Sequence, residues 1–169
     1  MKVVIRNLSS KKRSKKQYKE LRLFAKTIAN QLEINHKIKT LYLTYRDEWP
    51  HTYYPKQKPL GGFFKCWDGK RVSITFTGHW DVNMNTRMSS IVHELTHAKQ
   101  MINKELLVFR NGKTVKWRGE LNYSWKNFRF ETLDGIQDRK KRNKYTNKHF
   151  PWEKEVQLNI KKFVKNTHN

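Results

Sequence analysis

The sequence has a single cysteine, Cys66, among its 169 residues. One cysteine cannot form an intramolecular disulfide, and a metal site of the CxxC type is excluded by count. Residues 1–19 hold a short apolar patch and then a run of Lys and Arg, but no apolar stretch long enough for a signal peptide or a membrane span. We therefore expect a cytoplasmic protein without a membrane partner.

Acidic residues are also scarce: 14 Asp and Glu stand against 37 Lys and Arg, which gives a formal net charge of +23. Such a field attracts polyanions. Nucleic acid is the first candidate, because neutralised phosphates release counterions and aromatic side chains can stack on bases. Anionic cell-wall polymers fit the same charge. A lysine bias spread over a solvated surface is the alternative, so charge alone does not identify a partner.

The chain is long enough for one hydrophobic core and shows no compositional seam, which predicts a single domain over residues 1–169. Residues 1–15 form a basic N-terminal segment that could be flexible. Beyond it, apolar residues recur at steps of three and four and predict the buried stripe of a helix. These residues are Tyr18, Leu21, Ala25, Ile28 and Leu32.

Strand signals follow this helix. Residues 37–45 combine apolar side chains with Thr and Tyr, which favour strands. Two-residue turn signals predict β-hairpins at 63–77, around Asp68-Gly69, and at 106–117, around Asn111-Gly112. The remaining stretches, 46–62 and 122–150, read as long loops, and the second is aromatic and basic enough to suit substrate or polyanion contacts.

The chemistry-bearing motif lies at residues 93–97, which read His-Glu-Leu-Thr-His. The surrounding segment 86–103 has its apolar residues on one broad helical face. His93 and His97 are therefore one turn apart on the same face and can bind one cation together. Glu94 can reach a water on that metal without being a ligand, as a general base must. Histidines that only satisfy a hydrogen bond in the core are the alternative.

Two histidines leave a zinc site incomplete, and a third protein ligand must come from elsewhere. The metzincin continuation is excluded, because Gln100 and Asn103 stand where that pattern needs Gly and His. A later helix is predicted from Pro151 to Val164, with proline at its first position. A carboxylate or a histidine on such a later element remains as the third ligand.

At this point the sequence resembles a family. HELTHAKQ at 93–100, Trp-Arg-Gly at 117–119 and PWEKEV at 151–156 look similar to small bacterial and phage-encoded zinc metallopeptidases, which pair HExxHxxQ with PWExEA. The resemblance implies a zincin-like α+β domain with an N-terminal helix, a small mixed or antiparallel sheet, the HExxH helix and a C-terminal helix. This sequence departs from the pattern in having Val156 where alanine is usual.

The resemblance implies a Zn²⁺ cofactor held by His93, His97 and Glu153, in the manner of gluzincins. Glu155 lies about 200° further round the same helix and is expected to point away. His149 is the competing third ligand, which would give the three-histidine arrangement of SprT-like peptidases. Either carboxylate could instead simply face the helix dipole.

The expected function is hydrolysis of a protein or peptide substrate by a zinc-bound water that Glu94 activates. Strand 71–77 is predicted to be the edge strand on which an extended substrate pairs. Tyr123 and Tyr145 are weak candidates for oxyanion donors. The alternative is a non-catalytic protein that binds nucleic acid or another polyanion through its basic surface, with a structural HExxH helix.

The two functions are compatible, because SprT-like peptidases are recruited to DNA. A murein-directed hydrolase is a third reading, which would need a phage lysis system or a virion to deliver a protein without an export signal. If the chain is phage-encoded, its expected place is the host cytoplasm or the virion. The oligomeric state is left open by the sequence.

Overall fold

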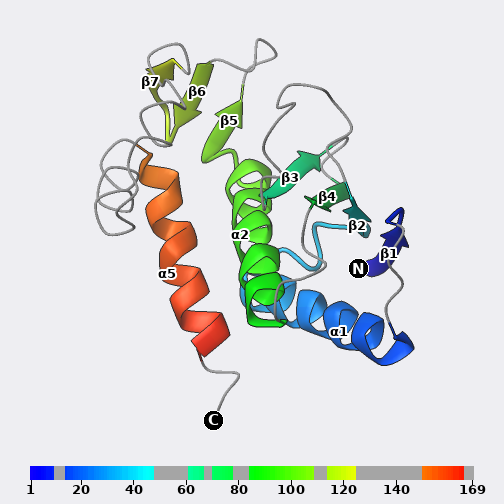
Figure 1. The fold of residues 1–169 in the computed structure, drawn as a ribbon. Coiled ribbons are helices and arrows are strands. Elements are labelled where there is room, and N and C mark those ends of the chain that lie inside the picture. The colour runs from blue at the N-terminus through cyan, green and yellow to red at the C-terminus, as the bar shows by residue number, and fades with distance from the viewer. Residues whose placement is uncertain are drawn as a thin grey trace.

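The computed structural model describes residues 1–9, 14–47, 61–66, 70–77, 84–108, 114–124 and 150–165. Helices and strands both occur, as the predicted α+β class requires (Figure 1). In chain order the elements are β1 (Lys2–Asn7), α1 (Lys15–Gln31), β2 (Thr40–Arg46), β3 (Gly61–Cys66), β4 (Arg71–Thr77), α2 (Met84–Ile102), β5 (Leu106–Val108), β6 (Thr114–Trp117), β7 (Glu120–Ser124) and α5 (Pro151–Lys165).

Four strands form a mixed sheet in the order β1-β2-β4-β3. β1, β2 and β4 are parallel, and β3 is antiparallel to β4. Alternate residues of the two central strands are buried, among them Leu41, Leu43, Val72 and Ile74, so one face of the sheet carries the core. The sequence predicted both central strands and the pairing of β3 with β4.

Two expectations about this sheet are wrong. Residues 2–7, placed by sequence in a basic segment that could be flexible, form β1, because they pair with β2 and Val3 is buried. Strand 71–77 is not an edge strand, since β4 is hydrogen-bonded to β2 on one side and to β3 on the other. Among the described strands, β1 and β3 lie at the edges of this sheet.

Helix α1 confirms the first predicted helix. It begins after Ser14, whose hydroxyl accepts a hydrogen bond from the Gln17 backbone N–H while the Gln17 side chain accepts one from the Ser14 N–H. Its apolar stripe, with Leu21 and Ile28 fully buried, joins the same hydrophobic core as the sheet. The connection from β1 through α1 to the parallel strand β2 is therefore a packed βαβ unit.

Helix α2 is the central element of the molecule. It lies between α5 and the sheet in Figure 1, and it contacts α1, α5, β3, β4 and β5. Ile91, Leu95 and Ala98 are fully buried on its apolar face. The helix ends in a Schellman motif, with Lys104 at φ 61° and the Glu105 N–H donating to the Gln100 carbonyl at 2.8 Å.

Helix α5 begins at Pro151, as predicted, and packs along α2. Its buried stripe includes Trp152, Val156 and Phe163. Trp152 also belongs to a second, smaller core with Leu106 and Phe150, beside the antiparallel sheet β5-β6-β7. This second core fixes the start of α5 against the end of α2.

The hairpin predicted at 106–117 is confirmed by the antiparallel pairing of β5 with β6. Strand β7 extends into the stretch that was expected to be a loop, because residues 120–124 pair with β6. Most of the predicted loops, residues 48–60 and 125–149, lie outside the described residues. Among the helices that are described, none combines the length and the apolar character needed to cross a membrane.

Candidate metal centre

The histidine pair is built by one turn of α2. His93 and His97 are four residues apart on this helix, so their rings lie on the same face. The two Nε2 atoms are 3.1 Å apart, and the rings meet edge to face with centroids at 4.7 Å. Both Nε2 atoms therefore face the same point in space, as two ligands of one ion would.

Helix α5 brings a carboxylate to this point. Glu153 Oε1 lies 3.2 Å from His97 Nε2, and Glu153 Oε2 lies 3.7 Å from His93 Nε2. One ligand atom from each of these three residues fits within 4.8 Å of the others, so the group could hold a metal ion. The residues that the sequence proposed as metal ligands are thus brought together from two helices.

The placement of Glu153 follows from how α5 packs. Trp152 and Val156 are buried, and Glu153 lies about 100° round the helix from Trp152. Its side chain therefore emerges beside the buried stripe and reaches the histidines across the junction. The side chain is 21% exposed, so solvent retains access to the cluster.

Glu94 follows His93 on α2 and is itself buried, with 8% of its side chain exposed. Its Oε1 is 4.0 Å from His93 Nε2. Burial raises the pKa of Glu94 to about 7, and the neighbouring His97 partly opposes this rise. A carboxylate poised near neutrality can both accept and return a proton at physiological pH.

The two histidines differ in electrostatic environment. The protein atoms around His93 exclude enough water to lower its pKa to about 4. The outer part of the ring still reaches solvent, since 37% of the side chain is exposed. Burial also acts to lower the pKa of His97, but the hydrogen bond and charge of Glu153 outweigh it and raise that pKa to about 9. Without a metal, His97 and Glu153 therefore form an ion pair, in which the pKa of Glu153 is lowered despite its burial.

Glu155 points away from the histidine pair, as expected, but it still faces α2. Its carboxylate accepts hydrogen bonds from Lys99 Nζ at 2.8 Å and Gln100 Nε2 at 3.1 Å, both on that helix. The reason is that the stripe facing α2 runs through Trp152 and Val156, and Glu155 lies about 60° from Trp152, on the opposite flank from Glu153. Both carboxylates therefore reach α2, but only Glu153 meets the histidines.

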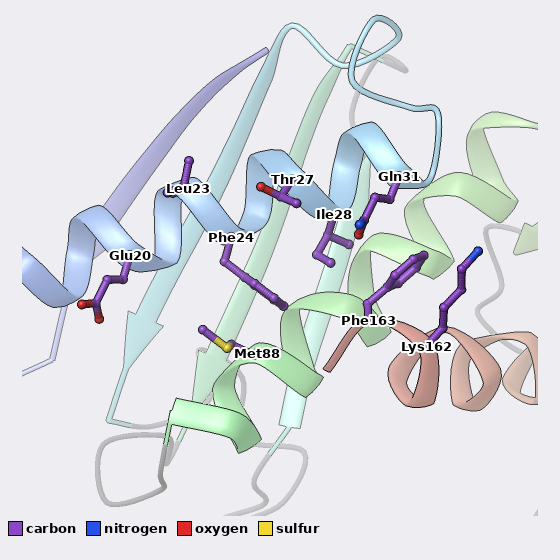
Figure 2. A pocket seen from close by; sticks show the side chains of 9 residues that line it. All are labelled: Glu20, Leu23, Phe24, Thr27, Ile28, Gln31, Met88, Lys162 and Phe163. Carbon is purple, nitrogen blue, oxygen red and sulfur yellow. The ribbon is translucent and has the colours of Figure 1, made fainter. Parts of the chain in front are cut away.

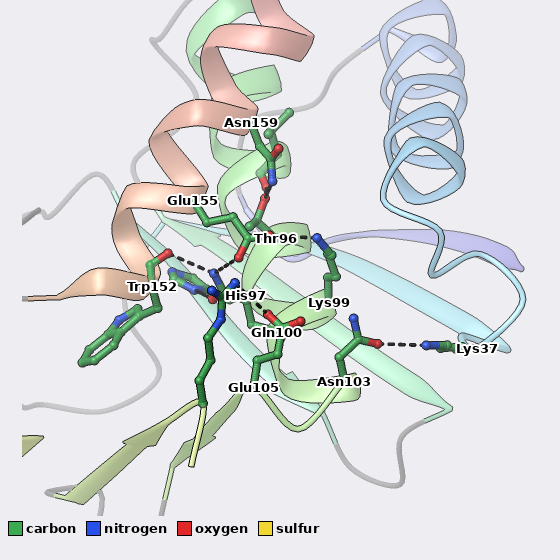
Figure 3. Close-up of polar contacts among 12 residues, drawn as sticks. Lys37, Thr96, His97, Lys99, Gln100, Asn103, Glu105, Trp152, Glu155 and Asn159 are labelled. Atoms are coloured by element: carbon green, nitrogen blue, oxygen red, sulfur yellow. Dashed lines mark hydrogen bonds and ion pairs between the residues drawn. The ribbon is translucent and has the colours of Figure 1, made fainter. Parts of the chain in front are cut away.

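Gln100 is the residue that sequence reasoning missed. It is fully buried and its side chain contacts His97, Trp152 and Glu155 (Figure 3). The signal that could have found it was its spacing, because a residue seven positions after His93 and three after His97 lies on the same helical face. In the sequence, Gln100 served to exclude a metzincin and to match the HExxHxxQ pattern, but no role was predicted for its side chain.

Three sequence candidates receive no structural assignment. His149 and Tyr145 lie outside the described residues. Tyr123 lies in β7, and only its backbone is described. The one carboxylate competitor, Glu155, is engaged elsewhere. Of the proposed third ligands that the structure describes, Glu153 is therefore the one beside the histidines.

A pocket in the described part of the chain lies away from this cluster. Leu23 and Phe24 of α1, Met88 of α2 and Phe163 of α5 contribute to its lining, which is mainly apolar (Figure 2). Met88 belongs to the N-terminal part of α2, and Phe163 to the C-terminal part of α5. Its lining includes the carboxylate of Glu20 but no histidine, so it does not offer the combination of imidazole and carboxylate groups that the cluster does.

No protein-family model, curated protein or solved structure matches this chain.

Proposed function

We propose that this protein is a zinc-dependent metallopeptidase whose metal is held by His93, His97 and Glu153. The observation that carries the proposal is the convergence of these three side chains, since two imidazole nitrogens and one carboxylate are the protein ligands of one major class of catalytic zinc sites. Three protein ligands leave the fourth position of a tetrahedral ion open, which is the arrangement of a catalytic rather than a structural site.

The separations among the ligand atoms agree with this choice. A tetrahedral ion with bonds of about 2.0–2.1 Å holds its ligand atoms about 3.3 Å apart. The corresponding distances are 3.1 Å between the Nε2 atoms, 3.2 Å from His97 to Glu153 and 3.7 Å from His93 to Glu153. Only adjustments of a few tenths of an ångström are therefore needed to accommodate zinc.

Each residue has a distinct role in the proposed reaction. Zinc, when bound, supplies Lewis acidity that polarises a carbonyl and makes water a better nucleophile. Glu94 accepts the proton of the attacking water and can return it to the leaving amine. The raised pKa of Glu94, about 7, suits a group that must do both. Its burial also keeps bulk water from competing for that proton.

Strand β3 is the proposed partner for an extended peptide substrate, in place of β4. A peptide can add to an edge strand through main-chain hydrogen bonds, whatever the side chains. Within the described sheet, β3 is an edge strand and also contacts α2, the helix that carries the histidines. An added strand would therefore run beside the metal-binding helix.

The decisive experiment is Glu94→Gln, assayed with unstructured protein substrates in the presence of zinc. The substitution keeps the size of the side chain and removes its ability to accept a proton, so hydrolysis should be abolished while zinc stays bound. Glu20→Gln, the same change on an exposed carboxylate of α1, is the matched control and should retain activity. Persistent hydrolysis by the Glu94 variant would end the proposed mechanism.

Polyanion binding is the second candidate, and α1 favours it. Lys15, Lys19, Arg22 and Lys26 are all exposed and follow one another at steps of four, three and four residues. They therefore form a stripe along one face of the helix. Such a stripe can follow a phosphate backbone, and it could bring a peptidase to proteins bound on nucleic acid.

The stripe is tested by measuring single-stranded DNA binding over a range of salt concentrations. Reversing two charges, Lys19→Glu with Arg22→Glu, should weaken binding and flatten the salt dependence by about one unit for each phosphate that is no longer neutralised. Equal binding and an equal slope in the parent and the variant would exclude this face as the polyanion site.

A further inference from the structure

The side chain of Gln100 connects the two helices that carry the proposed ligands. Its Oε1 lies 3.0 Å from His97 Nδ1. Its Nε2 donates hydrogen bonds to the Trp152 carbonyl oxygen at 2.9 Å and to Glu155 Oε2 at 3.1 Å. Because Gln100 is fully buried, these contacts do not compete with bulk water (Figure 3).

The chemistry of these partners fixes the orientation of the amide. A backbone carbonyl can only accept a hydrogen bond, so the group facing the Trp152 oxygen must be the NH₂ of Gln100. Its Oε1 must then face His97. An amide oxygen can only accept, so His97 has to donate from Nδ1.

A proton on Nδ1 has a direct consequence for the metal-binding atom. Whenever His97 is neutral only one of its nitrogens carries hydrogen, and with that hydrogen on Nδ1 the lone pair of Nε2 is free. Nε2 is the atom that faces His93 and Glu153. The amide therefore selects the form of His97 that can bind a metal through the correct nitrogen.

The same amide also holds the other helix. Trp152, whose carbonyl it binds, immediately precedes Glu153 in the chain. Glu155 is anchored in turn by Lys99, whose Nζ donates to Glu155 Oε1 at 2.8 Å. Gln100 is thus bonded to a ligand on α2 and to the backbone next to a ligand on α5.

We infer that Gln100 is a positioning residue, which orients His97 and fixes its tautomer while it aligns α5 so that Glu153 completes the metal site. The inference rests on the proposed metal centre, and Glu155 is its supporting anchor rather than a ligand. Loss of such an outer partner typically weakens metal binding by about 10- to 100-fold.

The test compares the zinc affinity of purified protein, measured by competition with a chromophoric chelator. Gln100→Met keeps the approximate volume of the side chain and removes all three hydrogen bonds, so affinity should fall by about 10- to 100-fold. Gln31→Met, the same change at an exposed position of α1, should leave affinity unchanged. The absorption spectrum of the Co²⁺-substituted protein provides a second readout, because its bands should shift when His97 is no longer oriented.

A pair of charge variants covers the case in which Gln100→Met fails to fold. Gln100→Glu alone places a second carboxylate against Glu155 and should weaken zinc binding. Combining it with Glu155→Gln exchanges the two groups, so the carboxylate at position 100 can accept from His97 and from the amide at position 155, whereas the hydrogen bond to the Trp152 carbonyl stays lost. The double variant should recover part of the zinc affinity that the single Gln100→Glu variant loses, because it removes the repulsion between two carboxylates but not the loss of the Trp152 contact.

Each outcome has a distinct meaning. If the parent binds zinc, and His97→Ala removes it, the proposed metal centre stands independently of Gln100. Unchanged affinity and an unchanged Co²⁺ spectrum in folded Gln100→Met would then overturn the inference, as would a failure of the double variant to improve on Gln100→Glu. Absence of zinc binding by the parent would instead overturn the proposed function, and the inference with it.

Discussion

Removing the α5 ligand gives the most quantitative test of the metal centre. Glu153→Gln keeps the shape of the side chain but replaces the carboxylate that lies 3.2 Å from His97 and 3.7 Å from His93. A neutral amide is a poor ligand for zinc, and the remaining two histidines both come from α2. The variant should therefore bind zinc much more weakly, and zinc should no longer connect α2 to α5.

The size of the effect follows from binding linkage. An ion that binds only the folded protein stabilises it by about 2.7 kcal/mol when its concentration is 100 times the dissociation constant. For a domain of this size, each kcal/mol raises the melting temperature by about 2–4 °C, so zinc should raise that of the parent by about 5–11 °C. A variant with about 100-fold weaker binding gains only about 0.4 kcal/mol at the same zinc concentration, which corresponds to under about 2 °C.

Differential scanning fluorimetry of chelator-treated protein, with and without added zinc, measures this difference. Glu20→Gln, an identical change on an exposed carboxylate of α1, should keep the full shift of the parent. A zinc-induced shift in Glu153→Gln as large as that of the parent would refute the assignment of Glu153 as a ligand.

Two further predictions follow from the same site and its core. The pKa of His97 is raised to about 9 from 6.5, so in metal-free protein the stabilisation from this group is complete below about pH 6.5 and is lost as the pH rises towards 9. Zinc must displace that proton, so calorimetry at pH 7 in buffers of different ionisation enthalpy should show that zinc binding releases protons. The zinc affinity should also rise up to pH 9. An affinity that does not depend on pH would contradict the raised pKa of His97. Leu95→Ala, at a fully buried position of α2, should cost about 2–5 kcal/mol in urea unfolding, and a cost under about 1 kcal/mol would show that this face is not tightly packed.

The sequence predicted the helices well because their signals are local. The stripe from Leu21 to Ile28, the spacing of His93 and His97, and the proline at 151 each depend on neighbours within a few turns. In both hairpins the turn residues lie directly between the two strands, so the pairing of the strands is signalled by residues that are close in the sequence. Such features can be read without knowing where any distant segment lies.

The errors concern partners that are distant in the chain. β1 is a short strand flanked by basic residues, and it is stabilised by parallel pairing with β2 across α1, which no local pattern records. Strand 71–77 was predicted to be an edge strand because it directly precedes the HExxH helix in the chain. Its second neighbour, β2, lies 31 positions earlier by register, with Leu41 opposite Val72. The helical angle of Glu155 was correct, but the position of α2 beside it was unknown.

In the candidate site, too, the local features were predicted from the sequence and the contacts between distant segments were not. The motif at 93–97 identified three of its members, and resemblance to a family supplied Glu153. The interpretation of Gln100 required the amide's three partners, two of which lie on α5, more than 50 residues away. A helical spacing can show that a glutamine shares the face of two histidines, but only the packed helices show what it binds.

The division of the ligands between α2 and α5 has a consequence during synthesis. Two histidines emerge from the ribosome well before the carboxylate that would complete their site, because α5 is the last described element of the chain. If the proposed centre operates, the polypeptide has no complete hydrolytic site until residues 151–165 have been made and have docked on α2. On the proposed function, a growing chain would therefore be protected from its own activity by the order in which its helices are translated.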